Sequence, residues 1–365
     1  MPSMMRALLL ACCFSLVGGL VRADKIRLEN GTTIDNVQVV SEGMKEVVYK
    51  EGKSERNVPS DSVRAVEYEK RPPQLADAEE LVLGEDPEGA VGTLDAFVQG
   101  AQEKPSTVAA FKWAPAAAAW RAIELRRGAG DLQGTVGAAQ QFLQSFPEAR
   151  FVPQAHLAKA QAEIRLGQGA QAQETLANLT ALLGAKSLSK RWALEGRLLL
   201  ALADDKQNSS TKRAEFEKVA SEAGDFLGAK YQAQVLIGET YLDEAQANAG
   251  AAKELRAKAI ETFDKVIASE QAPREAVAGA QTGRCESLFL LGADADDKAR
   301  LQEAALACLR VATLFRDQGL YMPKALFYAM RSFDLLPDPR RKADMKRELL
   351  GLFPGSAWAV EAKKY

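Results

Sequence analysis

The only histidine of the chain, His156, is the first candidate for acid–base chemistry. It stands in the alanine-rich stretch of residues 151–161, where apolar residues recur at helical spacing. An imidazole can act as a general base near neutral pH, but no cysteine-centred or serine-centred motif stands near it. A single histidine also excludes a zinc site with two histidine ligands. We therefore expect His156 to be a partly buried or surface residue of a helix.

The acidic residues Asp294, Asp296 and Asp297 could attract calcium. They lack the ligand spacing and the closing glutamate of a calcium loop, so carboxylates at a helix N-terminus are the simpler interpretation. The sequence contains no phosphate loop, dinucleotide-binding fingerprint, G-x-S-x-G elbow or H-E-x-x-H motif. We expect no catalytic residue, no metal ion and no cofactor, and hence a protein that is not an enzyme.

Two other features could bind a ligand at the surface. Trp113 and Trp120 fall on one helix face and could stack a ligand, although core packing is the commoner role of such residues. A basic run near the C-terminus could dock an anionic polymer or a lipid head group, although a solvated helix face is commoner. The run comprises Arg340, Arg341, Lys342, Lys346 and Arg347. The formal net charge of −2 gives no basic excess, which argues against nucleic acid as a partner.

Residues 1–23 have the features of a secretory signal peptide. Arg6 precedes an apolar run from Ala7 to Leu20, which suits a signal but is short for a membrane span. The small and apolar residues at its end predict cleavage after Ala23. We expect an exported protein, periplasmic or extracellular, whose mature chain has no transmembrane segment. Leu9-Leu10-Ala11-Cys12 resembles a bacterial lipoprotein box, which gives the alternative of a lipid anchor through Cys12.

Cleavage after Ala23 would leave Cys285 and Cys308 as the cysteines of the mature chain. Both fall in helical stretches, on either side of a loop near residues 292–297. An antiparallel helix hairpin could bring them within disulfide range. Two small buried thiols are the simpler interpretation, and it is the one that the sequence favours.

Residues 24–70 alternate apolar and polar side chains, which predicts a small β module. The expected strands span 25–29, 32–40, 46–50, 57–58 and 63–68, and the first turn is Asn30-Gly31. Five such short strands can bury a face by curling into a small barrel. The opening segment 24–31 and the closing segment 58–66 resemble those of Sm-like or SH3-like barrels that follow signal peptides in bacterial envelope proteins. This resemblance implies a fold and no ligand. Residues 71–74 contain Pro72-Pro73 and are the expected linker.

Residues 75–365 have a period near 3.6, with glycine, proline or aspartate at the breaks. Seven successive helix hairpins are expected, followed by a half-helix from residue 357, and this order predicts an α-solenoid. The pairs are 75–83 with 87–102, 106–127 with 131–145, 151–167 with 169–184, 187–203 with 209–227, 229–248 with 252–269, 273–291 with 296–316, and 321–336 with 339–352.

One phrase recurs along this array. Residues 146–155 and 353–362 share it, and residues 315–325 carry it stretched by one residue. In each copy an aromatic residue ends one helix, and an aromatic residue and then an alanine open the next. The phrase resembles the tetratricopeptide repeats of exported bacterial envelope proteins, which implies helix hairpins that pack small residues against large ones. The matching positions are Ala155, Ala172, Leu176, Ala233, Gly238, Tyr241, Ala259, Phe263, Ala305 and Leu309.

The chain also departs from that repeat pattern. Lys159 and Glu163 stand where the first helix of a repeat has leucine and tyrosine. The repeat lengths vary, and residues 75–145 scarcely match.

Helical arrays of this kind curve into a concave groove that holds peptides or partner domains. The sequence therefore predicts a non-enzymatic protein–protein interaction scaffold of the bacterial cell envelope. The identity of the partner, the binding face and the oligomeric state stay open. The alternative is an envelope polysaccharide-binding protein or a hydrolase, which would need carboxylates or aromatic residues that converge in the groove.

Overall fold

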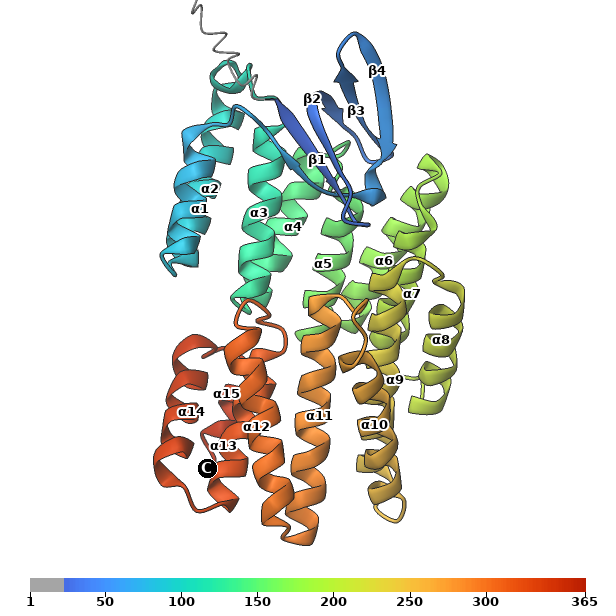
Figure 1. The fold of residues 1–365 in the computed structure, drawn as a ribbon, viewed down its shortest axis with the longest axis vertical. Coiled ribbons are helices and arrows are strands. Elements are labelled where there is room, and N and C mark those ends of the chain that lie inside the picture. The colour runs from blue at the N-terminus through green and yellow to red at the C-terminus, as the bar shows by residue number, and fades with distance from the viewer. Residues whose placement is uncertain (1–22) are drawn as a thin grey trace, which may run out of the picture.

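The computed structural model of the protein describes residues 23–365, in which a small sheet leads into a long array of helices (Figure 1). The predicted signal sequence, including Cys12, lies outside the described residues except for Ala23. Along residues 23–365, none of the helices combines the length and the apolar character needed to cross a membrane.

The sheet is antiparallel, with strand order β4-β3-β2-β1-β5. Its strands are β1 (Asp24–Leu28), β2 (Thr33–Glu42), β3 (Glu46–Glu51), β4 (Ser54–Pro59) and β5 (Val63–Glu67). The first half of β2 pairs with β1 and its second half pairs with β3. Ile26, Val47 and Tyr49 belong to the small apolar core beneath the strands.

The closed barrel expected for this module is not confirmed. Within residues 23–365, no strand ladder joins β4 to β5, so the sheet is open. Strand β4 is longer than predicted because its first residues, Ser54 to Arg56, are exposed and polar on the sheet edge. Charged residues are usual on an edge strand, where they discourage pairing with another chain, and they conceal the alternating pattern.

Helices occupy the remainder of the chain. The first eight are α1 (Pro73–Leu83), α2 (Pro87–Glu103), α3 (Ala114–Gly128), α4 (Leu132–Ser145), α5 (Val152–Arg165), α6 (Gly169–Lys186), α7 (Lys190–Ala203) and α8 (Ser209–Glu222). The others are α9 (Leu227–Ala247), α10 (Ala252–Ile267), α11 (Arg274–Ala295), α12 (Lys298–Leu314), α13 (Met322–Leu335), α14 (Pro339–Leu352) and α15 (Ala357–Ala362). The predicted fold class, a solenoid of helix hairpins behind a five-stranded sheet, is confirmed.

Several predicted helix boundaries differ from those of the structure, and a proline explains two of the differences. Helix α3 begins at Ala114 instead of residue 106, and only a short 3₁₀ helix, Pro105–Val108, precedes it. Pro115 explains the difference, because a proline fits the first turn of a helix but not its interior. Helix α1 begins at Pro73, inside the expected linker, for the same reason.

Short polar side chains fix where many helices begin. A side-chain oxygen accepts a hydrogen bond from a backbone N–H of the first helical turn, which satisfies a donor that the helix leaves free. The residues that do so are Asp86, Asp131, Ser189, Asn208, Asp297, Asp338 and Ser356.

The helices form two rows (Figure 1). The upper row holds α1 to α8 and the lower row holds α9 to α15, so the chain runs out along one row and returns along the other. The sheet leans against the upper row. Helices α3, α5, α7, α9, α11 and α13 contact one another in that order, besides the contacts within each hairpin. The alternate helices therefore form a continuous inner layer that faces the space between the rows.

Candidate functional site

A groove of about 1060 Å³ lies on this inner layer and is the candidate functional site. Helices α3, α5, α7, α9 and α11 contribute its helical walls, and residues 28–30, 61, 62 and 64 of the sheet module contribute one side. Trp120, Gln161, Trp192, Gln232 and Glu275 are among the lining residues. Both rows and the sheet thus surround one space.

Two arginines connect the walls of the groove. Arg191 of α7 donates to Glu29 Oε1 at 3.1 Å and to the carbonyl oxygen of Asp61 at 2.9 Å, which joins α7 to the sheet module. Its Nε also donates to Glu195 Oε1 at 3.0 Å. Burial raises the pKa of the Glu195 carboxyl, while the neighbouring Arg191 guanidinium opposes that shift. Arg191 therefore connects α7 to the sheet module and also lines the groove.

Arg127 of α3 is the second connecting arginine. Its Nη2 donates to Gln161 Oε1 of α5 at 3.0 Å and lies 3.5 Å from Glu275 Oε1 of α11. It thus joins the upper row to the lower row. Glu29, Glu195 and Glu275 all line the groove, and each is paired with one of these two arginines. This pairing does not favour the alternative of a hydrolase, which needs a carboxylic acid and a carboxylate at work on one bond.

Amide side chains add to the polar character of the groove. Each glutamine amide both donates and accepts hydrogen bonds, as a peptide group does. Four glutamines line the groove, together with leucines from three helices, so its surface offers both hydrogen-bonding and apolar groups to a polypeptide segment. These residues are Gln154, Gln161, Gln232, Gln271, Leu157, Leu198, Leu199 and Leu236.

His156 lies on α5 as predicted, and its side chain is half-buried. Burial, reinforced by the nearby Lys159 ammonium, lowers the pKa of the imidazole to about 4. His156 is not among the residues that line the groove. In residues 23–365, no group of three or more histidine, cysteine, aspartate or glutamate side chains is placed to hold a metal ion.

Lys159 and Glu163, the departures from the repeat pattern, form a buried polar cluster with Thr175 of α6. Lys159 Nζ lies 2.6 Å from Glu163 Oε1 and donates to Thr175 Oγ1 at 2.7 Å. The Thr175 hydroxyl in turn donates to Glu163 Oε2 at 2.8 Å. Three polar groups thus satisfy one another where the repeat pattern has two apolar side chains.

The predicted repeat-packing positions lie between helices. Phe263 is fully buried between α9 and α11, and its ring touches Gly238 and Gly283. Ala155, Ala172, Leu176, Ala233, Ala259 and Ala305 are also buried, whereas Tyr241 and Leu309 are half-buried. Their role as the defining positions of a repeat stays a prediction.

Trp113 and Trp120 stack on neighbouring aromatic residues. Trp113 stacks on Tyr68, which follows β5, with ring centroids 3.6 Å apart, and Trp120 stacks on Phe151 at 5.4 Å. Trp113 also borders a second cavity of about 890 Å³ between β2 and the turn that precedes α5. The stacking of Trp113 on Tyr68 helps to hold the sheet module against the array.

A buried ion pair also joins the sheet module to the array. Arg150, just before α5, lies with its Nε 2.8 Å from Glu42 Oε2 of β2, and its Nη1 donates to the carbonyl oxygen of Val63 at 2.9 Å. The hydroxyl of Tyr68 donates to the other Glu42 oxygen at 2.5 Å. Burial and the Glu42 carboxylate raise the pKa of Tyr68, so its hydroxyl stays protonated. These contacts fix the sheet module against the helical array.

The acidic segment 294–297 and the basic run near the C-terminus form helix caps and ion pairs. Asp297 caps α12, and Asp294 pairs with Arg256. In the basic run, Lys342 pairs with Asp334 of α13, while Arg341 and Arg347 pair with acidic residues of their own helix region. Arg340, Arg341 and Arg347 are exposed, as expected for a solvated helix face.

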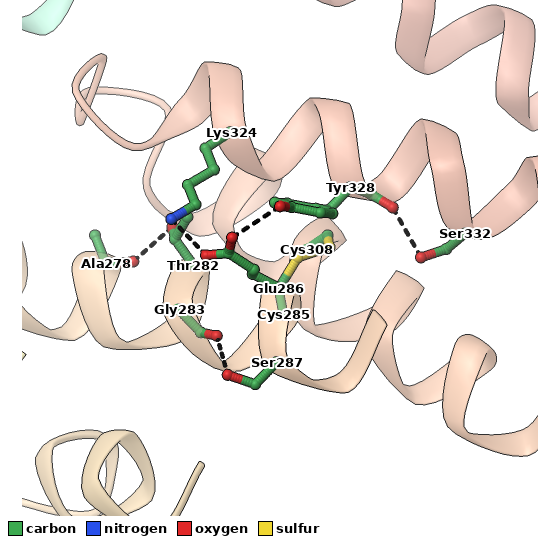
Figure 2. Close-up of a disulfide and its surroundings, with 10 residues drawn as sticks. All are labelled: Ala278, Thr282, Gly283, Cys285, Glu286, Ser287, Cys308, Lys324, Tyr328 and Ser332. Carbon is green, nitrogen blue, oxygen red and sulfur yellow. Dashed lines mark hydrogen bonds and ion pairs between the residues drawn. A yellow bond between two sulfur atoms is a disulfide. The ribbon is translucent and has the colours of Figure 1, made fainter. Parts of the chain in front are cut away.

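Cys285 and Cys308 form a disulfide, which corrects the expectation of two separate thiols (Figure 2). The antiparallel packing of α11 and α12 places their Cα atoms 5.2 Å apart, a distance that suits a disulfide. Both cysteines are fully buried.

A buried charge lies beside the disulfide. Glu286 Oε2 lies 2.5 Å from Lys324 Nζ of α13, and the Tyr328 hydroxyl donates to Glu286 Oε1 at 2.8 Å (Figure 2). Burial and the Glu286 carboxylate raise the pKa of Tyr328. This cluster, with the disulfide, holds α11, α12 and α13 together.

Sequence reasoning did not find the groove residues. Arg127, Arg191 and the glutamines belong to different hairpins, and the sequence gives no signal that they face one space. A charged or amide residue near a helix end is usually solvated. Only the curvature of the array brings these residues together.

Comparisons with solved structures give a likeness in fold, whereas comparisons with family models and curated proteins give none. No protein-family model matches the chain, and no curated protein matches it. A tetratricopeptide repeat protein from Parabacteroides merdae ATCC 43184, known from a crystal structure, is similar over 80% of this chain and 96% of its own, with 14% sequence identity and a TM-score of 0.41. The fold class stated above rests on the arrangement of the helices themselves.

Proposed function

We propose that this protein is a non-enzymatic scaffold that binds a segment of a partner protein in the groove between its two rows of helices. The observation that carries the proposal is the composition of the groove, in which glutamine amides and leucines from successive hairpins line one shared groove. Such a lining can hydrogen-bond a peptide backbone and bury apolar side chains at the same time. Glu29, Glu195 and Glu275 are each paired with Arg127 or Arg191, so these charged groups shape the walls.

A photo-crosslinking experiment tests this proposal. A photoreactive phenylalanine analogue at Gln161 or Gln232 should capture a discrete partner when the protein is expressed in its own cells. The matched control is the same analogue at Leu306, which is 60% exposed and does not line the groove. Equal capture from both kinds of position, or capture from Leu306 alone, would contradict binding in the groove.

We further propose that the protein is exported and acts in the bacterial cell envelope. The signal-like residues 1–23 support export. The disulfide between Cys285 and Cys308 is independent support, because disulfides persist mainly in oxidising compartments. Mass spectrometry of the native protein decides between an Asp24 start, a lipid-modified Cys12 and an uncleaved Met1. The last result, combined with free thiols at Cys285 and Cys308, would contradict export.

A further inference from the structure

The two ends of the inner layer meet at three glycines. Gly128 ends α3, Gly130 follows in the turn to α4, and Gly319 lies in the loop between α12 and α13. A Cβ atom on Gly319 would lie 2.2 Å from the carbonyl oxygen of Gly128 and 2.6 Å from the amide nitrogen of Gly130. The two backbones therefore touch directly, and only glycine permits this approach. The contact joins segments that are far apart in the sequence and closes the array into a ring (Figure 1).

The contacts beside this closure include an aromatic ring packed on a turn glycine and a partly exposed ion pair. The turn residue Gly130 also faces the ring of Phe353, which lies 3.0 Å from the position that a Cβ would take. The ion pair of Arg127 and Glu275 crosses between the rows at 3.5 Å, and the two side chains are 25% and 42% exposed. Exposed ion pairs contribute little to stability.

The contacts within each row are of a different kind. Successive hairpins share buried apolar clusters, such as the one around Trp120, Ile123 and Phe142 in the upper row. The cluster around Leu301, Met322 and Leu326 does the same in the lower row. Each row is thus held by burial of large side chains, whereas the ends of the ring are held mainly by backbone contact. We therefore expect separation at the glycines to cost less free energy than separation along a row.

We propose that Gly128, Gly130 and Gly319 form a latch, which keeps the two rows closed around the groove and opens to admit the partner segment. Arg127 and Glu275 lie beside the latch and also line the groove, so movement there widens the groove directly. The last part of this inference, admission of a partner, rests on the proposed function. The latch itself does not, because it can be tested on the protein alone.

The test is a pair of loop variants. Gly319→Val places a branched side chain against Gly128 and should force the latch open. Gly355→Val is the matched control, because Gly355 lies in the corresponding loop of the repeated phrase and a Cβ there meets nothing within 4 Å. We expect Gly319→Val to show a larger radius of gyration and maximum dimension by small-angle X-ray scattering. We also expect severalfold faster hydrogen exchange in peptides spanning residues 125–132 and 315–322, with the helical circular dichroism of the wild type.

Scattering and exchange that are the same for Gly319→Val, Gly355→Val and the wild type would overturn the latch. If Gly319→Val fails to fold, the milder variants Gly319→Ala and Gly128→Ala apply the same test, since a Cβ on Gly128 would lie 3.2 Å from the Asp317 carbonyl oxygen. Both should raise exchange at the two loops, and normal exchange in both overturns the proposal. Loss of crosslinking at Gln161 in a variant whose latch opens as expected would contradict admission of the partner through the latch, but not the latch itself.

Discussion

Lys159, Glu163 and Thr175 show how a polar cluster can replace an apolar pair inside a helix array. Lys159→Met would leave the Glu163 carboxylate buried with only Thr175 as a partner. We expect a loss of about 3 kcal/mol in the free energy of unfolding, measured by urea denaturation. Lys258→Met is the control, because Lys258 and Glu254 form an exposed pair on α10 whose loss should leave the free energy of unfolding almost unchanged. Equal costs for the two variants would show that the cluster at Glu163 contributes no more than a surface pair.

The pKa of His156 can be measured without ambiguity, because the chain has one histidine. We expect a value of about 4 from the pH dependence of its ring proton signals in NMR spectra. A lowered pKa means that the unfolded chain takes up a proton at higher pH than the folded chain does. The stability that the folded protein gains from its neutral, buried imidazole is therefore complete above pH ~6.5. It is lost as the pH falls toward 4. A value near 6.5, or a stability difference between wild type and His156→Gln that does not change between pH 7 and 4.5, would contradict the burial of the ring.

At the level of single residues, the sequence placed His156 on a helix but could not place its surroundings. Thr175, which completes the cluster with Lys159, lies on the next helix. Its contact depends on how α5 and α6 cross, and a periodic pattern does not encode that crossing. The bonded state of Cys285 and Cys308 was missed for the same reason, since a disulfide requires a particular axial offset between two helices.

The close packing of α9 and α11 depends on the ring of Phe263, which comes from α10 and fits against one glycine of each helix. A Cβ on Gly238 would lie 2.4 Å from Phe263 Cε1, and one on Gly283 would lie 2.2 Å from Cζ. The ring is fully buried and cannot move aside cheaply. We expect Gly238→Ala to lower the free energy of unfolding by about 2 kcal/mol, although alanine is the better helix former.

Gly137→Ala is the control for this element, because Gly137 lies within α4 and a Cβ there meets nothing within 4 Å. This variant should raise the free energy of unfolding by about 0.5–1 kcal/mol. Thermal or urea denaturation of the two variants gives the comparison. A gain in stability at Gly238 similar to that at Gly137 would show that α9 and α11 are not closely packed at Phe263.

At the level of elements, the sequence predicted most of the helices and strands, because period, caps and breaks are local properties. The early start assigned to α3 overlooked Pro115 within the predicted range. Barrel closure was not predictable from strand number alone, because it depends on whether β4 reaches β5. Local sequence patterns do not predict the groove, because the curvature of the array accumulates over many hairpins through small rotations at each one.

For the molecule as a whole, the question is whether the sheet module and the array unfold as one unit. Arg150 is central to the coupling of the two parts, because its guanidinium joins Glu42 of β2 and the backbone of Val63 to the start of α5. The side chains of Arg150 and Glu42 are only 5% and 9% exposed. Removal of the arginine would leave a buried carboxylate with Tyr68 as its remaining partner, which typically costs about 3 kcal/mol.

We therefore expect Arg150→Met to release the module before the array unfolds. Native-state hydrogen exchange should become faster throughout β1 to β5 while α9 to α13 keep their protection, because the strands alone bury too small a core to stay folded at full stability. Arg56→Met is the control, since Arg56 pairs with Glu51 within the module and both side chains are about half exposed. If both variants leave exchange in the strands unchanged, the module is held by its other contacts with the array, among them the Tyr68–Trp113 stack, Arg191 and the buried Met44. The groove would then keep its sheet-side wall without the buried ion pair.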